Sequence, residues 1–405
     1  MGIPLINRMA IESSNIVQGL GPSATLVMSA KAKELKAQGK TVYDLSLGEP
    51  DFITPRHICE AAIDAIKAGH TKYTLSSGLP ELKRAIVDKY KADYGLSYLP
   101  EQVVVANGAK HALHNAFFTT LNPGDEVIIP APYWVSYVEL VKLSGAVPVI
   151  IPTQESHNFK LSVEQFERTI TPRTRMLVLC SPSNPTGAVY CRSELEMLAE
   201  VVLKHDLFVF ADEIYNKLIY SNNEFVSFPT LYSGLPDRTI VVDGVSKTYA
   251  MTGWRIGWTL SPIHIAKKMG ELQSQQTSNP CGISQYAALS ALTGSQDCVV
   301  SMLSAFMERR DYVTKRIAAI EGLSCPAIDG AFYAFVNIKK FLGRKFGGVH
   351  VGNSEQFCLE LLSQKQVATV MGSAFGCEGY VRASFATSLE TLKEAFDQIE
   401  AFVRQ

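Results

Sequence analysis

The stretch VSKTYAMTGWRIG at residues 245–257 carries the most informative pattern in the chain. Its lysine, Lys247, follows an apolar run at residues 239–242 that predicts a β-strand, and Arg255 opens a second strand-like run at residues 255–260. A lysine amine can form a Schiff base with an aldehyde, and a nearby guanidinium can bind a phosphate. Lys247 and Arg255 together therefore favour a covalently held aldehyde cofactor that carries a phosphate group.

Short, continuous apolar runs alternate with helical periodicities from residue 48 to about residue 260. Strands are expected at residues 102–105, 125–129, 147–151, 176–180, 207–211 and 239–242, with intervening helices at 55–67, 80–94, 109–121, 133–143 and 194–204. Uninterrupted apolar strands separated by helices are typical of a mostly parallel sheet that is covered on both faces. We therefore expect an α/β fold, with a large domain at residues 48–292.

The pattern changes beyond residue 260, where strands become fewer and more polar. Helices are expected at residues 263–275, 283–293, 296–320 and 354–364, strands at 332–337 and 379–385, and a surface loop at 343–352. This pattern predicts a smaller α+β domain at residues 293–405. The N-terminal segment, residues 1–47, contains an expected helix at 23–38 and a strand at 42–47, and we expect it to pack with the small domain.

Composition excludes several classes of protein. The net charge of −1 gives no electrostatic reason to expect a nucleic-acid or membrane partner. The eight cysteines are scattered without a C-x-x-C pair, and residues 1–10 lack the apolar core of a signal peptide, so we expect a reduced, cytoplasmic protein. His111 and His114 lie one helical turn apart without a third ligand, and we expect no metal site.

Small and charged residues follow several of the predicted strands. Gly108 and Ala109 open a helix, where free backbone N–H groups bind phosphate. Asp212 follows the strand at 207–211, and a buried carboxylate there needs a cationic partner or takes up a proton. Arg382 lies in the strand at 379–385, and its guanidinium can bind a carboxylate through two parallel hydrogen bonds.

These motifs resemble, in type and order, those of the class I and II pyridoxal-phosphate (PLP) aminotransferases, and most closely the bacterial aspartate (aspartate/prephenate) aminotransferase subgroup. The resemblance covers about residues 20–400 and rests on NGAK at 107–110, PYW at 132–134, SPSNPTG at 181–187, DEIY at 212–215 and the lysine segment. It implies the PLP-dependent transferase fold type I, in which the large domain holds a mostly parallel seven-stranded sheet. It also implies a homodimer with shared active sites.

The resemblance assigns a role to each candidate residue around the cofactor. Lys247 is the catalytic residue and holds PLP as a Schiff base, and Asp212 pairs with the ring nitrogen. Asn184 and Tyr215 donate to the ring oxygen, and Trp134 stacks on the ring. The remaining cofactor contacts are Gly108, Ala109, Lys110, Ser246 and Arg255, together with Tyr73, which reaches the phosphate of the neighbouring subunit.

The substrate is expected next to this cofactor. By resemblance Arg382 binds the α-carboxylate, and Gly48, Trp134 and Asn184 lie near it. The implied activity is the transfer of an amino group from an L-amino acid, with aspartate as the first candidate, to 2-oxoglutarate by a ping-pong mechanism. The subgroup commonly has a lysine where this chain has Gly21, at a point where a substrate side-chain carboxylate can be met. Lys110 can supply a positive charge from another direction.

Three alternatives stay open at the level of sequence. The enzyme can instead be an aminotransferase for aromatic amino acids, alanine or prephenate. A PLP-dependent β-lyase of the same fold can keep the same lysine, asparagine, aspartate and arginine. A PLP-binding sensor domain fused to a basic DNA-binding module belongs to another class. We do not expect it, because only about 20 residues precede the matched region and the net charge is not basic.

Overall fold

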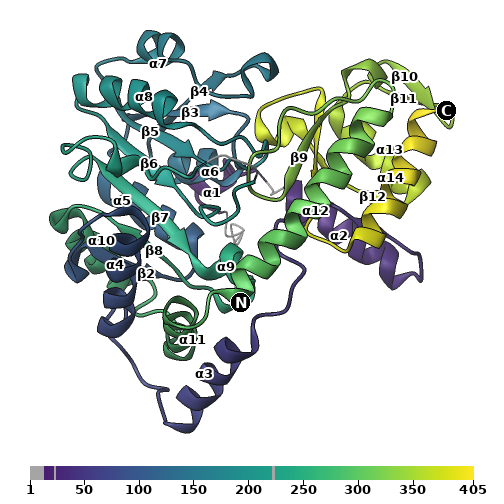
Figure 1. The fold of residues 1–405 in the computed structure, drawn as a ribbon. Coiled ribbons are helices and arrows are strands. Elements are labelled where there is room, and N and C mark those ends of the chain that lie inside the picture. Colours follow the sequence, from purple (N-terminus) through teal and green to yellow (C-terminus); the bar gives the residue numbers. More distant parts are fainter. Residues whose placement is uncertain (1–12, 22–23, 221–223) are drawn as a thin grey trace, which may run out of the picture.

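The computed structural model describes residues 13–21, 24–220 and 224–405, and it has two lobes (Figure 1). The large lobe is built on a seven-stranded sheet with the order β2 (Val103–Ala106), β8 (Gly257–Leu260), β7 (Thr239–Gly244), β6 (Phe208–Asp212), β5 (Thr174–Cys180), β3 (Glu126–Ala131) and β4 (Val147–Pro152). Only β8 runs antiparallel to its neighbours in this sheet. The predicted mostly parallel seven-stranded sheet is therefore confirmed.

Helices cover both faces of this sheet, as the continuous apolar strands require. One apolar layer lies under α4 (Pro80–Tyr94), α8 (Arg192–Lys204) and α11 (Gly282–Thr293), and the other under α5 (Ala109–Thr120), α6 (Ser136–Leu143) and α10 (Ile263–Gln276). Two further helices pack outside the first layer, α3 (Arg56–Lys67) on α11 and α7 (Val163–Thr169) on α8. The core strands β2, β6, β7 and β8 are buried along their whole length.

The small lobe is α+β, as predicted. Its antiparallel sheet has the order β13 (Val370–Met371), β14 (Tyr380–Ser384) and β9 (Tyr333–Asn337), and it packs with α12 (Asp297–Ala319), α13 (Ser354–Lys365) and α14 (Leu389–Val403). The prediction of a surface loop at residues 343–352 is wrong. This stretch forms a hairpin of β10 (Arg344–Phe346) and β11 (Val349–Val351), because Phe346 and Val351 are buried and Gly347 and Gly348 adopt the positive φ of a tight turn.

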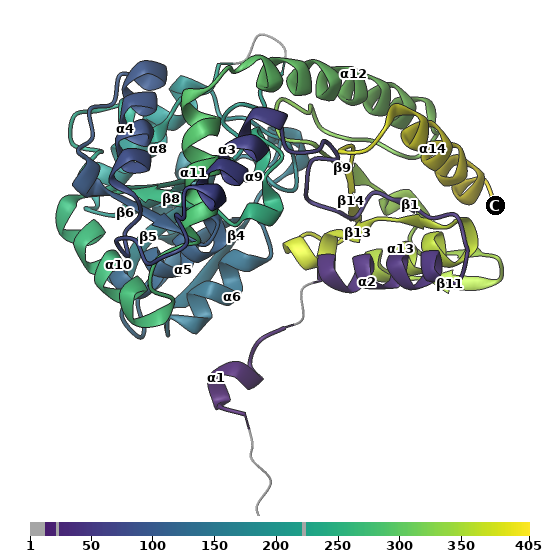
Figure 2. The ribbon, with the colours of Figure 1, turned by 90° about the horizontal axis from the view of Figure 1, so that it is seen from below.

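The N-terminal segment crosses to the small lobe. Helix α2 (Ala24–Ala37) contacts β13 and β12 (Val367–Ala368), and β1 (Tyr43–Asp44) pairs in parallel with β12. The strand expected at 42–47 is thus only two residues long. Before it, the exposed α1 (Asn15–Gln18) contacts α6 of the large lobe and projects below the two lobes in Figure 2. Pro22 and Ser23 lie outside the described residues.

Polar contacts join the two lobes. Arg309 binds Asp51 through two hydrogen bonds of 2.7 and 3.0 Å, and Glu155 accepts hydrogen bonds from Asn337 and Tyr380 at 2.7 and 2.9 Å. Within the described ranges, no helix combines the length and the apolar character that crossing a bilayer requires.

Candidate active site

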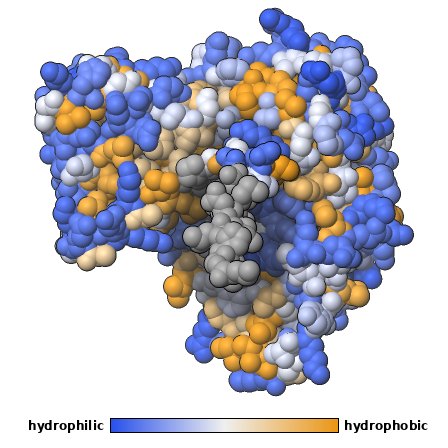
Figure 3. Space-filling model, turned by 180° about the vertical axis from the view of Figure 1, so that it is seen from behind, coloured by the Kyte–Doolittle hydropathy of each residue, from blue (hydrophilic) through white to orange (hydrophobic). Residues whose placement is uncertain are grey.

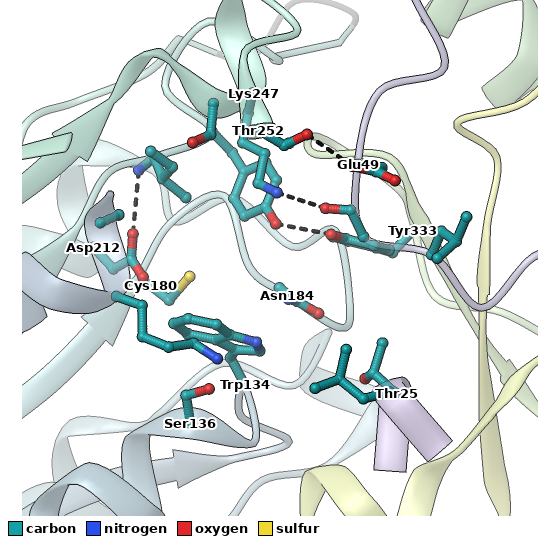
Figure 4. Close-up of a pocket in the computed structure, with 18 of the residues that line it drawn as sticks. Thr25, Glu49, Trp134, Ser136, Cys180, Asn184, Asp212, Lys247, Thr252 and Tyr333 are labelled. Carbon is teal, nitrogen blue, oxygen red and sulfur yellow. Dashed lines mark hydrogen bonds between the residues drawn. The ribbon is translucent and has the colours of Figure 1, made fainter. Parts of the chain in front are cut away.

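A cavity of about 450 Å³ lies between the lobes, at the carboxyl ends of the parallel strands. The large lobe contributes Asn184 from the loop after β5, Asp212 from the end of β6, and Lys247 from α9 (Val245–Thr248), which follows β7. The small lobe contributes Tyr333 and Arg382 from β9 and β14. Figure 4 shows Asp212, Asn184, Lys247, Trp134 and Tyr333 converging on this space.

Almost all of the sequence-predicted residues meet here. The cavity is lined by Gly48, Ala109, Lys110, Trp134, Asn184, Asp212, Tyr215, Ser246, Lys247, Arg255 and Arg382. Gly108 lies directly behind Arg255, because a Cβ added at Gly108 would approach Arg255 Nη2 to 2.4 Å. Tyr73 is the exception. Its side chain is 90% exposed and lies outside the cavity.

Lys247 is buried, and its surroundings set the state of its amine. Nζ donates a hydrogen bond to the backbone oxygen of Gly48 at 2.5 Å. Burial lowers the pKa of Lys247 from 10.5 to about 8, and the nearby Glu49 carboxylate opposes this shift. A substantial fraction of the amine is therefore neutral at mildly alkaline pH, as a nucleophile or a base requires.

Asp212 is a buried carboxylate that is 3% exposed. Its Oδ2 accepts a 2.6 Å hydrogen bond from the Tyr137 hydroxyl, and Oδ1 accepts one of 3.3 Å from the backbone N–H of Ile214. Burial raises the pKa of Asp212, although these hydrogen bonds oppose the shift. In the described part of the chain no cationic side chain binds this carboxylate directly. A protonated pyridine nitrogen fits such a site, since it would supply the missing positive charge.

The start of α5 and Arg255 form a compact anion site. Arg255 donates from Nη1 to the Thr252 oxygen at 2.9 Å and from Nη2 to the Asn107 oxygen at 3.4 Å, which fixes the guanidinium at the helix N-terminus. Gly257 in β8 allows this approach, because a Cβ there would come within 2.4 Å of the Ala109 nitrogen. A fixed guanidinium beside free helical N–H groups suits a phosphate.

Arg382 is 1% exposed and has only neutral partners. It donates from Nη1 to the side-chain oxygen of Asn184 at 3.1 Å and from Nη2 to the Ser46 oxygen at 2.7 Å, while Nε has no hydrogen-bond partner in the part of the chain that the structure describes. Among the described residues, no carboxylate forms an ion pair with it. The guanidinium lies over the ring of Tyr333, 4.5 Å from its centroid. This site fits an incoming carboxylate, which would balance the buried charge.

Lys110 and Trp134 form the opposite wall of the cavity. Lys110 Nζ lies 5.1 Å from the centroid of the Trp134 ring, and burial followed by the charge of Arg255 lowers the pKa of Lys110. Lys110 has no acidic partner within the described ranges. His111, the first member of the histidine pair, accepts a hydrogen bond from the Asn107 N–H at 3.2 Å through Nδ1.

Sequence reasoning missed several cavity residues that act through their neighbours. The Tyr333 hydroxyl lies 2.8 Å from that of Tyr215. Thr252 donates to Glu49 Oε2 at 2.7 Å, which ties the lysine segment to the chain beside Gly48. Tyr137, which holds Asp212, sits on an ordinary amphipathic helix. Only Thr252 could have been found from the sequence, since it lies within the lysine segment. Tyr137 and Tyr333 look like core residues in the sequence.

Comparisons with known proteins agree with this geometry. The family model described as aminotransferase class I and II matches residues 40–399. The aspartate/prephenate aminotransferase of Cereibacter sphaeroides is 46% identical, over 96% of this chain and 98% of its own, and the aspartate aminotransferase of Geobacillus stearothermophilus is 47% identical, also over 96% and 98%. The aspartate aminotransferase structure from Rhizobium meliloti superposes with a TM-score of 0.94 at 44% identity, covering 98% of this chain and 99% of that one. That of the Thermus thermophilus enzyme with maleate gives 0.92 at 40% identity, covering 97% and 100%.

Proposed function

The chain belongs to the class I and II aminotransferases, and on that premise we propose that it transfers the amino group of L-aspartate to 2-oxoglutarate, with PLP held on Lys247. The relatives named above as aspartate or aspartate/prephenate aminotransferases support this donor. The observation that carries the proposal is a pair of uncompensated buried charges in one cavity. Asp212 lacks a cationic partner and Arg382 lacks an anionic one among the described residues, as a site for a pyridinium and an amino-acid carboxylate requires.

Each proposed role follows from the contacts of the residue. Bound PLP supplies an electron-withdrawing ring that stabilises the negative charge left when a proton leaves the substrate Cα. Asp212, held by Tyr137, keeps the ring nitrogen protonated. Arg382 orients the substrate carboxylate, and Asn184 fixes Arg382 through its side-chain oxygen, which leaves its NH₂ group available as a donor.

Lys247 has two proposed tasks. Its neutral amine holds the cofactor aldehyde, and once displaced by the substrate its Nζ takes the Cα proton and later returns a proton as an acid. The hydrogen bond to the Gly48 oxygen holds Nζ at the boundary between the lobes. The lowered pKa of about 8 suits both tasks, because the amine can lose and regain a proton near neutral pH.

The decisive experiment incubates the PLP-loaded protein with aspartate and 2-oxoglutarate. Stoichiometric glutamate supports transfer, whereas ammonia release without glutamate supports a β-lyase and overturns the proposal. Lys247→Ala is expected to lower multiple-turnover transamination by at least about 10³-fold, because both the cofactor linkage and the base are lost. Lys268→Ala, which removes a surface lysine paired with Glu271, is the matched control and keeps full activity. Near-normal turnover by Lys247→Ala contradicts the assignment.

The donor is tested separately. Half-reactions with aspartate, alanine, phenylalanine and glutamate, and with prephenate as acceptor, rank the alternatives through the loss of cofactor absorbance. A preference for alanine or phenylalanine over aspartate overturns the aspartate proposal while leaving the aminotransferase reaction intact.

We also propose a cytoplasmic homodimer that shares its active sites. Exposed apolar side chains at both ends of α3 support an interface, since Ile53 before the helix is 91% exposed and Leu75, two residues after Tyr73, is 60% exposed. Figure 3 shows apolar areas on the lower projection of the large lobe, where α3 lies in Figure 1. All eight cysteines are free, which fits a reducing compartment.

A further inference from the structure

Helix α2 presents one face of its surface to the cavity. Thr25, Leu26, Ser29 and Lys33 line it, and three of these are four residues apart, so they lie in a row along one side of the helix. Figure 4 shows Thr25 on the side of the cavity opposite Asp212 and across from Trp134. Lys33 is therefore the last residue of this row on the small-lobe side of the cavity.

Lys33 is exposed and forms no hydrogen bond or ion pair with any described residue. Side chains on a helix lean toward its N-terminus, so the stem of Lys33 is expected to lean toward the turn of Ser29, and the residue lines the cavity. Its charge is thus available to a ligand in the cavity. The long, rotatable side chain can follow a carboxylate over several positions.

The other cations of the cavity have different neighbours. Arg255 is fixed at the start of α5, Arg382 is buried against Asn184, and Lys247 contacts Gly48. Lys110 is held over Trp134 on the far wall. Lys33 is therefore the one cavity cation, among the described residues, that approaches from α2.

Position 21, just before α2, carries no charged side chain. Gly21 carries none, and its N–H donates to Glu139 on α6 at 3.3 Å. Among the described residues of the N-terminal segment, one cation lines the cavity. Lys33 is that residue, two turns beyond Thr25 and about 12 Å along the helix axis.

We propose that Lys33 is a specificity-determining residue that binds the side-chain carboxylate of an acidic substrate from the small-lobe side. The inference rests on the proposed aminotransferase function. Because Lys33 lies at the outer end of the row, it acts more strongly on five-carbon dicarboxylates, glutamate and 2-oxoglutarate, than on aspartate. Alanine has no second carboxylate and is insensitive to it.

The test replaces the charge and keeps most of the stem. Half-reactions of PLP-loaded Lys33→Met with glutamate, aspartate and alanine are compared with those of wild type. The kcat/KM for glutamate is expected to fall about tenfold. The kcat/KM for aspartate is expected to fall less, and the kcat/KM for alanine is expected to stay unchanged. Lys33→Arg is expected to restore the kcat/KM for glutamate. The matched control is Lys31→Met, an exposed lysine of the same helix that does not line the cavity, and it leaves all three values unchanged.

A binding measurement without turnover completes the test. The PLP-loaded variants are titrated with glutarate and maleate, two unreactive dicarboxylates. Lys33→Met should weaken the binding of glutarate more than the binding of maleate. An unchanged glutamate-to-alanine ratio and unchanged glutarate affinity in Lys33→Met overturn the role of Lys33 and leave the proposed function standing. Wild-type protein that reacts with alanine but with neither acidic amino acid overturns both the aspartate proposal and this inference.

Discussion

At the scale of single residues, the Lys247 amine is expected to set the pH dependence of cofactor uptake. Burial lowers the pKa of Lys247 to about 8, so the amine is mostly protonated below pH 8 and mostly neutral above it. Only the neutral amine has a lone pair for an aldehyde. We expect the rate of PLP uptake by the cofactor-free protein to rise about tenfold per pH unit up to pH 8 and to level off above it.

Glu49 provides the test of that explanation. Its carboxylate is the largest influence that raises the pKa of Lys247, and it accepts a hydrogen bond from Thr252. Glu49→Gln removes the charge and keeps a hydrogen-bonding group, so the midpoint of the pH profile should move to lower pH. The measurement is stopped-flow absorbance of PLP uptake, with Glu60→Gln on the exposed face of α3 as control. A midpoint that stays in place or rises would show that Glu49 does not act on this amine.

At the scale of elements, the contact between β8 and the start of α5 fixes the predicted phosphate site. A Cβ at Gly257 would lie 2.4 Å from the Ala109 nitrogen and 2.9 Å from its Cα, and backbone atoms cannot move as a flexible side chain can. Gly257→Ala should therefore push α5 away, lower the free energy of unfolding by about 1–3 kcal/mol and weaken PLP binding at least about tenfold. Denaturant unfolding and PLP titration measure the two effects.

Gly253→Ala is the matched control, because a Cβ at Gly253 meets no atom within 4 Å. It lies in the same segment and changes the same number of atoms. Equal PLP affinities for the two variants would mean that the close packing of β8 against α5 does not determine the geometry of the phosphate site.

The elements also show how far sequence alone reaches. The central strands were predicted to within one or two residues, since β6 and β7 are buried on both faces and read as continuous apolar runs. The strands β12 and β13 were missed as separate elements because two residues cannot display a period. Residues that carry charge at strand ends, such as Asp212, could be found in the sequence. Tyr137 could not, because its role depends on the hydrogen bond to Asp212.

At the scale of the whole molecule, the position of Tyr73 bears on assembly. Its hydroxyl cannot serve the cavity of its own chain from a side chain that is 90% exposed and outside that cavity. If it reaches the phosphate of a second copy, Tyr73→Phe should weaken PLP binding about tenfold, as expected for the loss of a hydrogen bond to a charged group. Equilibrium titration with PLP checks this, and sedimentation checks that the variant has the same association state as the wild type.

Hybrid dimers decide whether the site is shared, because the two defects can be placed on different chains. In a dimer of Tyr73→Phe with Lys247→Ala, a shared arrangement gives one site with both native residues and one site with neither. Random pairing makes half of the dimers hybrids, each with one intact site out of two, so an equal mixture should recover about a quarter of wild-type activity at a PLP concentration too low to saturate Tyr73→Phe. If each tyrosine served its own chain, no site of a hybrid dimer would contain both the native Tyr73 and the native Lys247. The activity of the mixture would then not rise above that of the Tyr73→Phe chains alone.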